Sequence, residues 1–229
     1  MVLANLIHST RNCGIFTEVD HGPATIANNI FLPPDSGVCH DSAGNAYAHN
    51  LIAGAVENHG PDARRTPALV PHQTDIAAVV RAVNGDHRVY NNLLAGPAGF
   101  APFDSDFLPC AGAGNVYTGA ATPGPSKYES GAVVNKTWDA AVTLTEAGGV
   151  WTLQLSTDPG WAAQQARAQV NTALLGVANL TAQPFTLPDG SPFALATDYF
   201  GRPRSANPFP GPFEASGELR VQVWPKPQR

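Results

Sequence analysis

An Asn-led repeat most constrains the fold that this chain can adopt. Asn recurs before a short aliphatic run at five positions, which are Asn5, Asn29, Asn50, Asn92 and Asn115. The successive spacings are 24, 21, 42 and 23 residues. Periods in the twenties are typical of solenoids made of stacked coils, and the dense Leu ladder of leucine-rich repeats is absent from the sequence. The 42-residue interval equals two periods of 21, so one coil has a variant sequence or contains an insertion.

A parallel β-helix accounts for this repeat physically. Each coil pairs its strands with the coils above and below it, about 4.8 Å away, and its aliphatic residues point inward. Asn suits the corner because it tolerates left-handed backbone angles, and stacked Asn amides can hydrogen-bond along the stack. The 22 Gly and 21 Pro, about a fifth of the 229 residues, favour short strands and many turns. The sequence therefore predicts an all-β fold, with about five to six β-helix coils over residues 1–120.

The chain changes character in residues 121–229. A connector rich in Pro, Gly and Ser spans 121–131, and alternating apolar and polar residues at 140–145 and 150–155 predict a hairpin. Asp158-Pro159 and Gly176 are typical start and stop signals, so we expect one helix over 159–175. An extended tail and a final strand at 218–224 follow. We expect this whole region to pack along the solenoid or to cap its C-terminal end.

Charge and cysteine usage exclude several classes of function. The net charge of −5 gives no footprint for nucleic acid, and no apolar run of about 18 residues indicates a membrane span. No leader peptide is visible, which favours a cytoplasmic location. Three widely spaced cysteines, Cys13, Cys39 and Cys110, predict buried free thiols rather than disulfides. Short-range ligand spacings are absent from the sequence, so we expect no metal and no cofactor.

Acidic and imidazole side chains concentrate in the repeats. Glu18 opens the run Glu-Val-Asp-His-Gly-Pro, which includes His21, and Asp41 follows 23 residues after Glu18, close to one coil. Corresponding positions would stack the two carboxyls one strand spacing apart, and retaining glycosidases separate theirs by about 5–5.5 Å. Asp41 could equally be a solvated turn residue. Glu18 follows strand-like sequence, where an acid is costly unless it has a partner.

Two further clusters lie in and after the long interval. His72 belongs to a Pro-His-Gln-Thr-Asp run, and Asp86 and Arg88 alternate onto one strand face and could pair. One interpretation makes His72 a polar loop residue and Asp86–Arg88 an exposed ion pair. The other makes these three residues, with His21 and Asp41, ligands for sugar hydroxyls.

The sequence also resembles glycoside hydrolase family 120, β-xylosidase-like enzymes with a right-handed parallel β-helix. The similar runs lie at 5–54, 71–75, 85–92, 197–201 and 207–214. The resemblance implies that Glu18 is the general acid/base, acting on an oligosaccharide or aryl glycoside by the two-carboxylate retaining mechanism. It places the nucleophile, an Asp, about 23 residues before Glu18 and so before Met1, which implies that this sequence is a C-terminal part that could be inactive alone.

Three functions therefore stay open. The first is a β-xylosidase-type hydrolase whose missing N-terminal coils, or a second chain, pair with the uncapped edge of the first coil. The second is a non-catalytic carbohydrate-binding or assembly module that keeps the groove without the chemistry. The third is a polysaccharide lyase, although the sequence shows no acidic calcium cluster.

Overall fold

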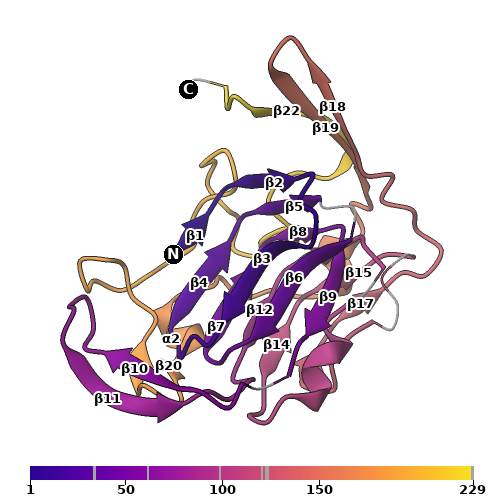
Figure 1. The fold of residues 1–229 in the computed structure, drawn as a ribbon. Coiled ribbons are helices and arrows are strands. Elements are labelled where there is room, and N and C mark those ends of the chain that lie inside the picture. The colour runs from indigo at the N-terminus through magenta and orange to yellow at the C-terminus, as the bar shows by residue number, and fades with distance from the viewer. Residues whose placement is uncertain (33–34, 61, 98, 120, 122–123, 228–229) are drawn as a thin grey trace.

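The chain folds as a parallel β-helix followed by an irregular C-terminal region (Figure 1). The computed structural model describes all residues except 33–34, 61, 98, 120, 122–123 and 228–229. The fold class predicted from the Asn repeat is confirmed. Within the described residues, no helix is long and apolar enough to cross a membrane.

Three parallel sheets form the faces of the solenoid; the first three coils contribute one strand to each face, and the later coils contribute strands to the first two faces. The first face contains β1 (Val2–Leu3), β4 (Ala24–Ala27), β7 (Asn45–Ala48), β12 (Arg88–Tyr90), β14 (Ala111–Ala113) and β16 (Glu129–Ser130). The second contains β2 (Leu6–His8), β5 (Ile30–Leu32), β8 (Leu51–Ile52), β13 (Leu93–Leu94), β15 (Val116–Tyr117) and β17 (Val133–Val134). The third contains β3 (Cys13–Glu18), β6 (Ser36–Asp41) and β9 (Ala55–Asn58).

The 42-residue interval is one coil with an insertion. Strands β7 and β12 are direct neighbours, with Tyr47 opposite Val89. The intervening residues form an antiparallel hairpin, β10 (Arg65–Leu69) and β11 (Ile76–Arg81), which leaves the body of the solenoid. In Figure 1 this hairpin lies beside the segment labelled β20. The 3₁₀ helix η1 (Ala101–Ser105) lies in the next coil.

The repeated Asn residues form the predicted amide ladder. The side-chain Nδ2 of Asn5 donates to Oδ1 of Asn29 at 3.0 Å, and the same bond recurs in every following coil as far as Asn115. Each acceptor oxygen also receives the backbone N–H of the preceding ladder Asn. The left-handed conformation falls on the residue before each ladder Asn, for example His49 at φ 53°. The ladder Asn residues therefore serve the stack through hydrogen bonds rather than through their own backbone angles.

Apolar side chains from the first two faces fill the solenoid, and the outer side of the second face is buried under the C-terminal region. Ile26, Tyr47 and Val89 stack in successive coils of the interior. On the outer side, Leu51 and Leu93 pack into a second cluster with aromatic residues of the C-terminal region. The region therefore packs along the solenoid.

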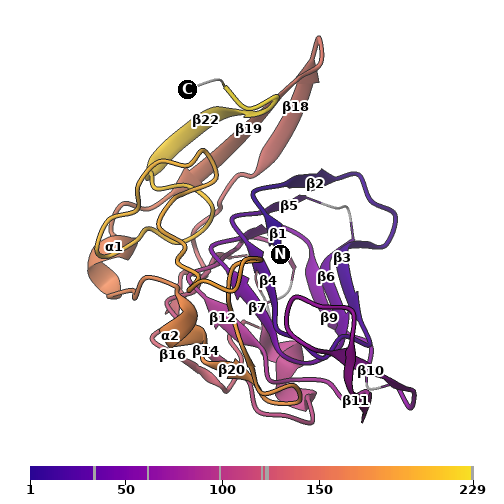
Figure 2. The same cartoon turned by 90° about the vertical axis from the view of Figure 1, so that its left-hand side faces the viewer.

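The C-terminal hairpin and final strand are confirmed. Strands β18 (Thr143–Ala147) and β19 (Val150–Thr157) form an antiparallel hairpin, and β22 (Gly217–Trp224) adds to β19. The resulting three-stranded sheet projects beyond the first coil (Figure 1 and Figure 2). A short hairpin, β20 (Val177–Ala178) and β21 (Gln183–Pro184), lies between them in sequence.

The single helix expected over 159–175 is wrong. The structure has two short helices, α1 (Trp161–Gln164) and α2 (Thr172–Leu175), and the backbone is extended at Gln165. The buried guanidinium of Arg167 explains the break, because it donates to the carbonyls of Trp161, Gln165 and Gly114. The Arg167 side chain, which is anchored to Gly114 in the solenoid, thus takes up carbonyls that a continuous helix would use.

The expectation of three free thiols is also wrong. Cys13 on β3 and Cys39 on β6 form a disulfide, with their Cα atoms 5.8 Å apart. Parallel stacking of adjacent coils places these two strands side by side, so residues 26 apart in sequence meet. Cys110 keeps a buried free thiol.

Candidate functional site

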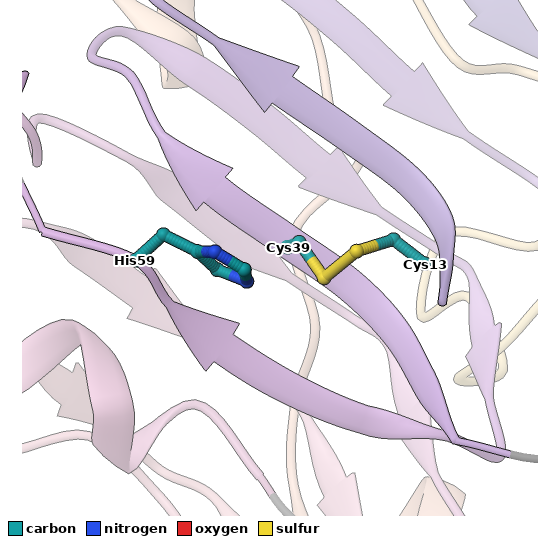
Figure 3. A group of neighbouring side chains, drawn as sticks. All are labelled: Cys13, Cys39 and His59. Atoms are coloured by element: carbon teal, nitrogen blue, oxygen red, sulfur yellow. A yellow bond between two sulfur atoms is a disulfide. The ribbon is translucent and has the colours of Figure 1, made fainter. Parts of the chain in front are cut away.

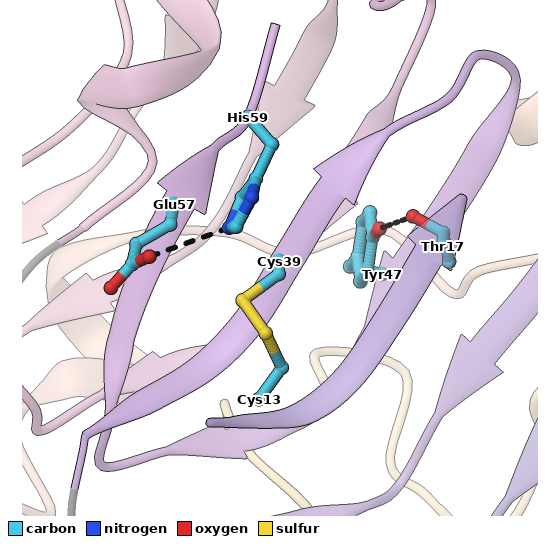
Figure 4. The surroundings of a disulfide bond; sticks show 6 residues. All are labelled: Cys13, Thr17, Cys39, Tyr47, Glu57 and His59. Atoms are coloured by element: carbon cyan, nitrogen blue, oxygen red, sulfur yellow. Dashed lines mark hydrogen bonds and ion pairs between the residues drawn. A yellow bond between two sulfur atoms is a disulfide. The ribbon is translucent and has the colours of Figure 1, made fainter. Parts of the chain in front are cut away.

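Glu18 and Asp41 lie directly opposite each other at the ends of neighbouring strands. In the pairing of β3 with β6, Glu18 is the register partner of Asp41. The predicted stacking of these two carboxyls is therefore confirmed. Side chains alternate along a strand, and Thr17, which precedes Glu18, hydrogen-bonds inward to Tyr47 at 3.1 Å (Figure 4). Glu18 and Asp41 consequently lie on the outer face of this sheet.

Asp41 is held in place and largely shielded from solvent. Its Oδ1 accepts the backbone N–H of Val19 at 2.8 Å, and only 8% of the residue is exposed. Val19 has a left-handed backbone, φ 53°, which turns its N–H toward this carboxyl. Burial raises the pKa of Asp41, and the neighbouring Glu18 adds to the rise. The alternative of a solvated turn residue is thus wrong for Asp41.

Glu18 finds its partner in the inserted segment. Its Oε1 accepts from Nη2 of Arg64 at 2.8 Å, and about half of each side chain is exposed. Arg64 also donates to Asp62 at 2.7 Å, and the hydrogen bonds that it donates, to Asp62 first and to Glu18 second, raise the pKa of the guanidinium. Sequence reasoning missed both residues, because their position beside Glu18 depends on where the insertion folds.

A pocket of about 660 Å³ opens next to this pair of carboxyls. Three segments line it: the turn after β3, the β10–β11 hairpin and the loop around β21. Val19 and Asp20, which follow Glu18, belong to the lining, whereas Glu18 and Asp41 themselves stand outside it. His21 and His72 both line the pocket. The structure therefore brings two of the predicted binding residues together beside the predicted catalytic one.

His21 lies in a tightly packed turn. It is 5% exposed, and its Nε2 is 2.7 Å from the Thr66 hydroxyl of the inserted hairpin. Among the described residues its Nδ1 has no hydrogen-bond partner. Burial raises the pKa of the adjacent Asp20. A Cβ on Gly22 would lie 2.3 Å from the Gly44 carbonyl oxygen, so only glycine lets the coils approach this closely.

His72 connects the hairpin to the C-terminal region. It sits in the turn between β10 and β11, is exposed, and its Nε2 is 3.1 Å from the Thr186 hydroxyl. Gln183 donates to the Leu69 carbonyl at 2.6 Å nearby. The pocket wall is thus built by contacts between two segments more than a hundred residues apart.

Asp86 and Arg88 form the predicted ion pair, at 2.8 Å, but the pair is largely buried rather than exposed. Asp86 Oδ2 accepts the backbone N–H of Asn179 at 2.7 Å, and Arg88 Nε donates to the Leu175 carbonyl at 3.0 Å. Neither residue lines the pocket. Their contacts fasten α2 and β20 to the solenoid, and this structural role distinguishes them from His21 and His72.

Two groups of potential metal ligands occur among the described residues. Cys13, Cys39 and His59 converge on the outside of the β3–β6–β9 sheet (Figure 3), but the disulfide occupies both sulfurs. The exposed His59 instead pairs with Glu57 at 3.4 Å (Figure 4). The second group is His40, His87 and Asp106, inside the solenoid.

Comparison with known proteins finds one structural relative. No protein-family model and no curated protein matches the sequence. The chain is similar to the solved structure of XylC in complex with xylose, with a TM-score of 0.87 and 24% identity over 97% of this chain. The chain spans 39% of that protein's length. The likeness shows the fold, a parallel β-helix as in XylC.

Proposed function

We propose that this chain is part of a retaining glycoside hydrolase of β-xylosidase type, with Glu18 as its general acid/base. The position of Glu18 on the first coil is the observation that supports it. A coil stacked before β3 would place a register partner about 4.8 Å from Glu18. Retaining enzymes separate their carboxyls by about 5–5.5 Å. The resemblance to glycoside hydrolase family 120 puts an Asp nucleophile at that position, 23 residues upstream.

The edge of the first coil favours such a neighbour. Among the described residues, β1, β2 and β3 each pair on one side only. No hydrogen bond of the described residues reaches Asn5 Oδ1, whereas every later ladder oxygen accepts from the coil before it. At this edge the apolar residues Leu3 and Phe16 are 39% and 42% exposed. An edge with free ladder acceptors and apolar side chains is suited to pair with a further coil.

In this proposal Glu18 protonates the glycosidic oxygen and then activates the water that releases the sugar. Arg64 donates to Glu18 and positions its carboxyl. At the adjacent pocket the exposed His72 imidazole is suited to bind sugar hydroxyls, and the buried His21 forms part of the wall. The xylose bound to XylC supports a sugar as the ligand.

Asp41 is a poor candidate for the nucleophile, despite its position opposite Glu18. One carboxylate oxygen is already bonded to Val19, and the group is largely buried. A non-catalytic sugar-binding module is therefore the second candidate for the chain by itself. The pocket between His21 and His72, which does not depend on a further coil, favours it.

Hydrolysis of an aryl β-xyloside tests the proposal. We expect no nitrophenol release by the 229-residue chain alone. In a longer chain that adds the in-frame upstream coding sequence, we expect turnover that Glu18→Gln lowers by at least ~100-fold. Azide should restore turnover of an activated aryl xyloside in this variant, because a small nucleophile needs no general base.

Two results would contradict the proposal. Turnover that Glu18→Gln leaves unchanged in the longer chain would remove the acid/base role. Xylose binding by the 229-residue chain, with no turnover by either chain, would favour the binding module. His72→Ala would then be expected to weaken binding strongly, and Asp86→Asn, outside the pocket, serves as the control.

A further inference from the structure

We propose that His40, His87 and Asp106 bind a divalent transition-metal cation, such as Zn²⁺, inside the β-helix. His40 is on β6, His87 directly precedes β12, and Asp106 follows η1. All three side chains are fully buried, at 0% exposure. Their ligand atoms lie within 4.8 Å of one another. This site is independent of the proposed hydrolase chemistry, because it lies on the inner side of the sheet.

The separations suit a four-coordinate ion. His40 Nε2 lies 3.8 Å from Asp106 Oδ1, and His87 Nε2 lies 3.8 Å from Asp106 Oδ2. Ligand atoms at about 2.1 Å from a tetrahedral Zn²⁺ are about 3.4 Å apart. Contraction by a few tenths of an ångström would therefore bring one nitrogen of each imidazole and the carboxylate around one ion. Imidazole and carboxylate are among the ligands that Zn²⁺ accepts.

An unpartnered nitrogen points into the cluster. The Asn45 backbone N–H lies 3.4 Å from His87 Nδ1, so the His87 proton is on Nε2, which donates to His40 Nδ1 at 3.2 Å. The remaining His40 proton then lies on Nε2, which has no hydrogen-bond partner among the described residues. A buried N–H without a partner is unfavourable. Coordination through a nitrogen lone pair would remove this defect.

The surroundings hold the carboxylate and exclude water. Asp106 Oδ1 accepts from the amides of Asn58 at 2.7 Å and Asn84 at 3.0 Å, which fixes the carboxylate plane. The Phe103 ring packs edge-on against His40, with centroids 4.5 Å apart. The Cys110 thiol lies 3.5 Å from Asp106 Oδ2. This contact also helps to hold the carboxylate in place.

A route to the site exists on the outside of the sheet. A hollow of about 490 Å³ is bounded by β9 and η1, and its lining includes Asn58 and Ser105. Asn58 also donates to Asp106 and to the Ser105 hydroxyl. Movement of this one amide side chain would connect the hollow to the ligands, and a metal site needs such an entry path.

Zinc binding to the 229-residue chain, made without a histidine tag and stripped with a chelator, tests the proposal. We expect one Zn²⁺ per chain and a higher melting temperature with Zn²⁺. Asp106→Asn keeps the shape and an amide acceptor but should weaken Zn²⁺ binding by more than ~100-fold. His59→Gln changes an exposed histidine outside the cluster and should bind like the wild type. Equal binding by wild type and Asp106→Asn, or no binding by the wild type, overturns the proposal.

Cobalt keeps the test decisive if Asp106→Asn does not fold. Co²⁺ bound to the wild-type chain should give the intense visible absorption of a four-coordinate ion, and His40→Gln should remove this absorption. A pale six-coordinate spectrum would place the ion at an exposed site and overturn the proposal. Circular dichroism of each variant checks the fold.

Discussion

The two faces of the β3–β6–β9 sheet differ in chemistry, although adjacent residues build them. Thr17 and His40 point into the solenoid, and Glu18 and Asp41, the next residue on each strand, point out of it. Inside, burial lowers the pKa of His40 to about 3 and raises that of Asp106 to about 7. Outside, the hydrogen bonds from Arg64 lower the pKa of Asp62. Ionisable side chains inside the solenoid therefore favour their neutral forms, whereas those exposed to water are charged and form ion pairs.

The largest expected effect separates the two faces directly. Asp106→Ala removes a buried carboxylate that accepts from the amides of the half-buried Asn58 and the buried Asn84, and it leaves a cavity inside the solenoid. We expect metal-free protein to lose about 3–5 kcal/mol of unfolding free energy. Glu18→Ala removes only a solvent-exposed ion pair, so we expect no measurable change in the urea midpoint. Urea unfolding monitored by circular dichroism compares the two, and similar losses would contradict the distinction between the faces.

The disulfide links β3 and β6, the strands that contribute residues to both faces of the sheet. Its removal should therefore lower the stability of both faces. Replacing Cys13 and Cys39 by Ser opens a loop of 26 residues, and we expect a cost of about 2–4 kcal/mol. Reductant should lower the melting temperature of the wild type and leave the double variant unchanged. Thiol titration of the unfolded wild type should find only the Cys110 thiol. Three titratable thiols would show that the bond does not form.

The sequence predicted what depends on short-range periodicity. The Asn spacing predicted the coils, and the 23-residue separation of Glu18 and Asp41 predicted their register. The sequence did not predict features that depend on contacts between distant residues. The extended backbone after α1 is fixed by Arg167, whose guanidinium reaches Gly114 from another part of the fold. A hydrogen-bond partner that is distant in sequence produces no local sequence pattern.

The same limit applies to the candidate sites. Arg64 meets Glu18 only because the insertion folds back over β3, and the sequence left open whether that interval was an insertion at all. The ligands of the proposed metal site are far apart in sequence, at residues 40, 87 and 106. Spacing rules for metal sites test only near neighbours in sequence, so the absence of short-range ligand spacings says nothing about this cluster.

The amide ladder allows the buried and exposed environments to be compared with one residue type. Asn50 is fully buried and bonds to Asn29, Asn92 and the Ile26 carbonyl. Asn5 is exposed on the first coil. We expect Asn50→Ala to cost about 1–3 kcal/mol, because buried partners are left unpaired, and Asn5→Ala to cost less than about 1 kcal/mol. Urea unfolding measures both, and a larger loss at Asn5 would show that the ladder is not what stabilises the stack.

The smallest expected effect concerns Asp41, a largely buried acid of the outer face. Burial raises its pKa above 3.8, so the unfolded state releases this proton at a lower pH than the folded state does. The carboxylate therefore destabilises the fold as pH rises through 3.8 and remains unfavourable at neutral pH. Asp41→Asn keeps an acceptor for the Val19 N–H. We expect the variant to melt slightly above the wild type at about pH 7, with the difference vanishing below about pH 4.

An acid with the opposite shift provides the control for Asp41. Hydrogen bonds from Ser191 lower the pKa of the exposed Asp189, so its carboxylate stabilises the fold above 3.8, and that contribution is lost as pH falls through the lowered folded-state pKa. Asp189→Asn should therefore melt below the wild type near neutral pH, and the difference should shrink on acidification. Melting temperatures of the two variants across this pH range should diverge from the wild type in opposite directions. A shift of the same sign in both would mean that burial does not set the charge of Asp41, and the outer face would then be uniformly solvated.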